Sequence, residues 1–74
     1  TIEEAFGEVI RDIRKAKQIS QETLADASNL DRSFISLLEC GHKKPSLLTI
    51  FQIAKAFNLP ASKILSLVED KIKK

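Results

Sequence analysis

The stretch that decides the fold runs from Ser20 to Gly41 and reads SQETLADASNLDRSFISLLECG. Ser20 favours the N-cap of a helix, and the apolar spacing after it predicts a helix that continues to about Ala27. Asp31 is the predicted N-cap of a further helix, Arg32–Cys40, and Gly41 follows where a left-handed residue commonly ends a helix. We therefore expect two short helices joined by a connection of about four residues.

The short connection determines how these two helices are arranged. Helices joined by so few residues cross steeply, which is the helix-turn-helix arrangement. In that arrangement the second helix lies in the major groove of DNA, while the first helix lies across the backbone. The stretch therefore predicts a DNA-binding element.

The second helix of the pair has a face that suits base reading. Ile35 and Leu38 are three residues apart, so both are expected to point into the core. The opposite face carries an arginine, two serines and a leucine: Arg32, Ser33, Ser36 and Leu37. Arginine bonds guanine through two hydrogen bonds, serine bonds several base edges, and an aliphatic side chain meets a thymine methyl group. These four residues are the predicted base contacts.

Three further helices are predicted around this pair. A first helix over Ile2–Lys17 has apolar residues three and four positions apart, at Ile2, Phe6, Val9, Ile10 and Ile13. Ser46 is the predicted N-cap of a helix that reaches Phe57, with an apolar face made of Leu47, Ile50, Phe51, Ala54 and Phe57. Asn58 ends that helix, and Pro60 precedes a last helix that carries Ile64, Leu65, Val68 and Ile72. The sequence contains no strand pattern. It predicts a compact, all-α, five-helix domain over residues 1–74.

Composition narrows the class of protein. The chain has 74 residues, 43% of them hydrophobic, which suffices for one small core. A formal net charge of +2 is compatible with nucleic acid but does not by itself indicate it. The single cysteine, Cys40, excludes an internal disulfide and fits a reducing cytoplasm. No apolar run approaches the ~20 residues of a membrane helix, so we expect no membrane association.

Residue patterns typical of catalysis and metal binding are missing from the sequence. It contains no phosphate-cradling glycine loop, no carboxylate pair and no Ser/His/Asp set. His42 stands without cysteine or acidic residues at ligand spacing. We therefore expect no enzyme, no cofactor and no metal.

The motifs of the chain resemble those of the phage Cro and repressor helix-turn-helix proteins, and among them the controller proteins of restriction–modification systems. The matching segments are FGxVIxxIR in the first helix, SQETLA and LDRSFISLLECG in the central pair, and KKPS and IAKAFNLP beyond it. They cover nearly the whole chain. The resemblance implies a sequence-specific transcriptional regulator from a bacterium or phage.

The resemblance also implies roles for residues outside the base-reading face. Gln21 matches a glutamine that contacts a DNA phosphate and braces the recognition helix. Lys43 and Lys44 match basic residues that grip backbone phosphates. Arg14 and Glu39 match a structural ion pair that ties the first helix to the third.

A homodimer is the expected binding form. Proteins of this kind bind as dimers to half-sites about 34 Å apart, so that two recognition helices reach successive major grooves. We expect the last helix and its approach to form the interface, through Asn58, Ile64, Leu67, Val68 and Ile72. The resemblance places Leu65 in the core instead.

The expected partners are double-stranded DNA and a second copy of the chain, with RNA polymerase or a toxin protein as further candidates. An antitoxin uses the same fold, and would bind a toxin as well as DNA. A protein-interaction module on this fold is the alternative from a different class. An acidic or bulky recognition face would favour that module, whereas Arg32, Ser33, Lys43 and Lys44 favour DNA.

Overall fold

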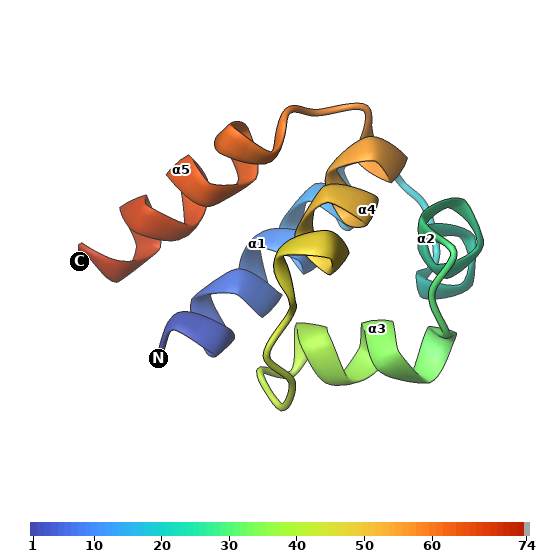
Figure 1. Cartoon of the computed structure of the whole chain (residues 1–74), viewed down its shortest axis with the longest axis horizontal. Helices are drawn as coiled ribbons and strands as arrows, with labels where there is room; N and C mark the ends of the chain where they lie inside the picture. Colours follow the sequence, from blue (N-terminus) through green and yellow to red (C-terminus); the bar gives the residue numbers. More distant parts are fainter. Residues whose placement is uncertain (74) are drawn as a thin grey trace.

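The computed structural model describes residues 1–73, which form five α-helices and no strand (Figure 1). The helices are α1 (Ile2–Ala16), α2 (Gln21–Ser28), α3 (Arg32–Glu39), α4 (Leu47–Phe57) and α5 (Ala61–Ile72). The predicted all-α fold is confirmed, and the expected ends of α1, α2 and α3 differ from the observed ends by a single residue. None of these helices combines the length and the apolar character needed to cross a membrane.

Local side-chain chemistry determines where α2 and α4 begin and end. Ser20 Oγ accepts a hydrogen bond of 3.0 Å from the backbone N–H of Thr23, and Ser46 does the same at the start of α4. Asn29 and Asn58 follow these helices with φ of 60° and 58°, the left-handed conformation that stops a helix. The predicted caps at Ser20 and Ser46 are therefore confirmed.

Asp31 occupies the N-cap of α3, as predicted, but its side chain makes no capping hydrogen bond. The expectation that this carboxylate caps the helix is therefore wrong. The N–H of Ile35 still donates to Asp31 O at 3.0 Å, which is the usual first backbone hydrogen bond of a helix.

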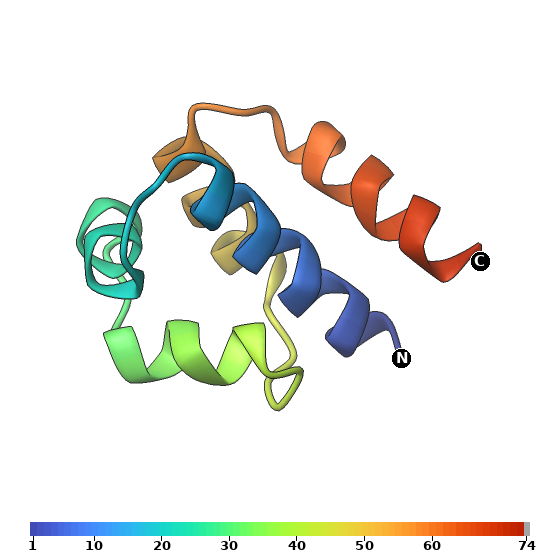
Figure 2. The same ribbon diagram turned by 180° about the vertical axis from the view of Figure 1, so that it is seen from behind.

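Helix α1 is the central helix of the bundle. It packs against α3 on one side and α5 on the other, while α2 and α4 pack on each other (Figures 1 and 2). The buried apolar residues form one core: Ala5, Phe6, Val9, Ile10, Leu24, Ala25, Ile35, Leu38, Ile53, Ala54, Phe57, Ile64 and Val68. This core supports α3 from the inside and leaves its other side to solvent.

Helix α4 buries Ala54 and Phe57 in the core, as its apolar pattern predicted, but not Leu47 and Phe51. Leu47 and Phe51 are 69% and 56% exposed, whereas Thr49 and Ile53 are buried. The helix is apolar around most of its circumference. Spacing alone therefore could not show which stripe packs inside.

Helix α5 reverses two further expectations. Ile64 and Val68, predicted at an interface, are buried in the core, and Leu65, predicted in the core, is 40% exposed. Neighbouring residues on a helix point about 100° apart, so an error of one position exchanges the inner and outer sides. Leu67 is half-buried against the core and Ile72 is exposed. Ile64 and Val68 are therefore unavailable to a partner.

Helices α1 and α3 are in close contact at Gly7. A Cβ added to Gly7 would overlap Leu38 O and would lie 2.8 Å from Glu39 O. Those carbonyl groups belong to the last turn of α3, so even a methyl side chain would push this end of the helix away from α1. The glycine is needed for space.

Gly7→Ala is expected to destabilise the protein. In an exposed helix this change stabilises by about 1 kcal/mol, whereas overpacking a tight contact costs about 1–3 kcal/mol. The free energy of unfolding, measured by urea denaturation, should therefore fall. A variant as stable as the wild type or more so would contradict the close approach of the two helices.

Candidate nucleic-acid interface

Helix α3 forms one outer edge of the molecule in both ribbon views (Figures 1 and 2). Ile35 and Leu38 are fully buried, as predicted from their spacing. The side chains on the other side reach solvent to different degrees: Arg32, Ser33 and Leu37 are exposed, and Ser36 is half-buried. The predicted base contacts therefore share one solvent-facing side of α3.

The turn between α2 and α3 fixes the angle of this helix. Ser28 is buried, and its Oγ donates to Leu24 O at 2.7 Å. After the left-handed Asn29, the N–H of Leu30 donates to Ala25 O at 2.9 Å. These bonds hold the turn against the end of α2, and α2 and α3 also pack against each other.

One buried carboxylate joins the first three helices. Arg14 donates from Nε to Glu39 Oε2 at 2.6 Å and from Nη2 to Oε1 at 3.0 Å. The same guanidinium donates from Nη1 to Ile19 O at 3.0 Å, which holds the connection between α1 and α2. Gln21 Nε2 donates to Glu39 Oε1 at 3.0 Å. The hydrogen bonds to Glu39 raise the pKa of Arg14 above its usual value.

Lys43 and Lys44 lie exposed in the loop that follows α3. Gly41 begins this loop at φ 80°, and the N–H of His42 donates to Leu37 O at 2.9 Å. A Cβ on Gly41 would meet the side chain of Glu4, so the loop packs against the start of α1. The loop thus holds both lysines next to the carboxyl end of α3.

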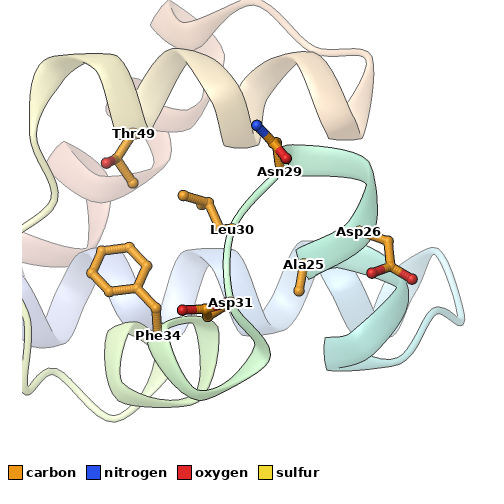
Figure 3. Close-up of a pocket in the computed structure, with 7 residues that line it drawn as sticks. All are labelled: Ala25, Asp26, Asn29, Leu30, Asp31, Phe34 and Thr49. Carbon is orange, nitrogen blue, oxygen red and sulfur yellow. The ribbon is translucent and has the colours of Figure 1, made fainter.

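A groove of about 480 Å³ opens beside the first turn of α3 (Figure 3). Its lining residues are Ala25, Asp26, Asn29, Leu30, Asp31, Phe34 and Thr49. In Figure 3 the ring of Phe34 and the side chain of Leu30 lie between α3 and α4, and both pack partly against the core. Phe34 therefore helps to seat α3 on the bundle and is turned away from the base-facing side.

Residues 1–73 contain no group of three histidine, cysteine or acidic side chains arranged to hold a metal ion. Cys40, just after α3, is exposed. The groups that α3 and its loop present are cationic, hydroxylic and aliphatic, which are the kinds of group that bind phosphates and base edges.

Comparison with known families decides the class of this arrangement. A family model described as helix-turn-helix matches residues 10–64, a span that includes all of α2 and α3. The chain belongs to the helix-turn-helix family.

Regulators of restriction–modification systems are among its relatives. The control protein C.SmaI of Serratia marcescens is 35% identical over 65 residues, which cover 88% of this chain and 77% of that protein. The restriction–modification controller protein C.AhdI of Aeromonas hydrophila is 39% identical, with a TM-score of 0.82 over 84% of this chain and 94% of that one. The resemblance to controller proteins is thus confirmed.

One of the similar solved structures is a controller protein bound to its operator site. A mutant of the controller protein C.Esp1396I, bound to its highest affinity operator site, is 30% identical to this chain. The two structures superpose with a TM-score of 0.91 over 99% of this chain and 96% of the other.

Two features of the site were not predicted from sequence. The resemblance implied that Gln21 braces the recognition helix, but not that Glu39 is the partner. The hydrogen bond between the two joins residues 18 positions apart, and no local pattern signals it. Buried Ser28 carries a signal that was missed. A serine three and four residues after apolar helix positions often turns its hydroxyl back to the carbonyl groups there, as Ser28 does with Leu24 and Ala25.

Breaking the Arg14–Glu39 pair is expected to unfold the site. Their side chains are 12% and 4% exposed, and removing one partner of a buried pair costs about 3–5 kcal/mol because the other charge is stranded. Glu39→Ala should therefore lose that amount in urea denaturation.

The double variant Arg14→Met/Glu39→Leu is the matched control, because it removes both charges. It is expected to retain most of the wild-type stability. If Glu39→Ala were as stable as the double variant, the pair would have no role in holding the helices.

Proposed function

We propose that this protein binds a palindromic DNA operator as a homodimer and regulates transcription from it. The observation that carries the proposal is the solvent-facing side of α3, held at a fixed angle by α2 and bordered by two exposed lysines. Membership of the helix-turn-helix family supports it.

In this proposal the residues divide into base and phosphate contacts. Arg32 and Ser33 lie in the first turn of α3 and read base edges, with Ser36 and Leu37 one turn further along. Gln21 begins α2, where the free N–H groups and dipole of a helix favour a phosphate. Lys43 and Lys44 neutralise backbone phosphates beside the bound groove.

Base reading is tested by selecting operators from a pool of random duplexes and then measuring Kd for the enriched sequence. Arg32→Ala should lose about 1–3 kcal/mol on that sequence and relax the selection at one position of each half-site. On random DNA the same variant should change little.

Lys43→Ala is the matched control, since it removes a positive charge without removing a base contact. It should weaken binding to selected and random DNA alike and should reduce the salt dependence of binding. If the pool yields no enriched palindrome and binding is only weak and salt-sensitive, the protein is not a base-reading regulator.

Ile64 and Val68, which were expected at the dimer interface, are buried in the core. We therefore place the proposed interface on the exposed side of α4 and α5. Five large apolar side chains of these two helices are exposed: Leu47, Leu48, Phe51, Leu65 and Ile72. Beside Phe51, a groove of about 440 Å³ runs between the end of α4 and Pro60, which precedes α5. Exposed apolar surface of this kind is typical of protein–protein contacts. Asn58, exposed at the end of α4, stays part of the proposed interface.

Phe51→Glu is expected to convert the dimer to a monomer. The side chain is 56% exposed in the single chain, so the fold should tolerate the change, while a charge at the centre of an apolar interface should prevent pairing. Sedimentation would measure the mass, and Kd for the selected operator should rise.

Ile2→Glu provides a matched control on α1, where the replaced side chain is 66% exposed. This variant should stay dimeric. If Phe51→Glu sediments as a dimer as well, the interface lies on another surface.

A further inference from the structure

The side chain of Gln21 is already held in place before any DNA arrives. Its Nε2 donates to Glu39 Oε1, and Glu39 is itself fixed by two hydrogen bonds from Arg14. Gln21 is half-buried and Glu39 is buried. An amide at the start of α2 is therefore tied to α1 and α3 through a single carboxylate.

The chemistry of the acceptor decides which way this amide faces. An ionised carboxylate only accepts hydrogen bonds, so the nitrogen of Gln21, and not its oxygen, must face Glu39. The amide group is planar, and its nitrogen carries two N–H groups. With one of them bonded to a fixed carboxylate, the second has a set direction, and within residues 1–73 it has no acceptor.

We propose that Glu39 is a positioning residue for DNA binding, which holds the Gln21 amide so that its second N–H meets an operator phosphate. The proposal rests on the proposed function, since it concerns the phosphate contact assigned to Gln21. The Arg14–Glu39 pair then contributes to operator affinity as well as to the fold.

The gain comes from ordering the side chain in advance. A free glutamine must give up its rotamer freedom when it binds, at a cost of about 0.5–1.5 kcal/mol. This corresponds to about 2- to 12-fold in Kd for each subunit. A glutamine that Glu39 already holds has lost this rotamer freedom on folding, so it loses little more when it binds DNA.

A double-mutant cycle tests the proposal. Gln21→Ala is made in the wild type and in the Arg14→Met/Glu39→Leu background, which lacks the carboxylate but removes both charges together. Urea denaturation checks that each protein is folded, and Kd is measured for the selected operator duplex. We expect Gln21→Ala to raise Kd about tenfold in the wild type and less than twofold in the background without the pair.

Lys43→Ala is the matched control within the cycle. Lys43 is exposed and no hydrogen bond joins it to Glu39 in the described chain. Its loss should therefore raise Kd by the same factor in both backgrounds. Equal losses for Gln21→Ala in both backgrounds would show that Glu39 acts only on the fold, with operator binding left intact. If the wild type selects no operator, the proposed function itself fails.

A measurement on the wild type alone covers the case in which the background without the pair does not fold. The side-chain amide of Gln21 should be rigid by ¹⁵N relaxation in the free protein and should change little when the operator is added. Gln18, which is exposed, gives the mobile reference in the same spectrum. A Gln21 amide as mobile as that of Gln18 would overturn the proposal.

Discussion

The carboxylate of Glu39 is the interaction on which the rest of the arrangement depends. It lies at the end of α3, and it is reached by Arg14 from α1 and by Gln21 from α2. Side chains from three separate helices thus meet at one carboxylate. Because hydrogen bonds to a charged group are stronger and more directional than neutral ones, the carboxylate adds a specific restraint on the three helices to the packing of the apolar core.

Local chemistry made much of the fold predictable. The caps at Ser20 and Ser46 and the breaks at Asn58 and Gly41 depend on residues close together in sequence, so their types were enough to place the helices. The outward face of α3 also followed from the spacing of two buried residues. The hydrophobic pattern did not show which apolar side of α4 and of α5 faces the core. Phe51 and Leu65 are as apolar as core residues, and only packing showed that they point outward.

That error has a physical reason. A chain of 74 residues buries only about 60% of the surface that its unfolded form exposes. Its core is thin, and apolar side chains beyond those that fill it remain on α4 and α5. In sequence, an apolar residue that stays on the surface looks the same as one that is buried in the interior. The resemblance implied that Gln21 braces the recognition helix, but its partner Glu39 was not predicted, because that contact depends on the final distance between two helices.

The close approach at Gly7 has a consequence for how such proteins diversify. Gly7 packs against the carbonyl groups of Leu38 and Glu39 in the last turn of α3. The hydrogen bonds to the Glu39 side chain restrain the same turn. The first turn, with Arg32 and Ser33, is exposed and carries none of these restraints. Selection can therefore exchange residues at one end of the helix while the other end stays anchored. Under the proposed function, a lineage of such chains can therefore acquire new target sequences while its fold stays the same.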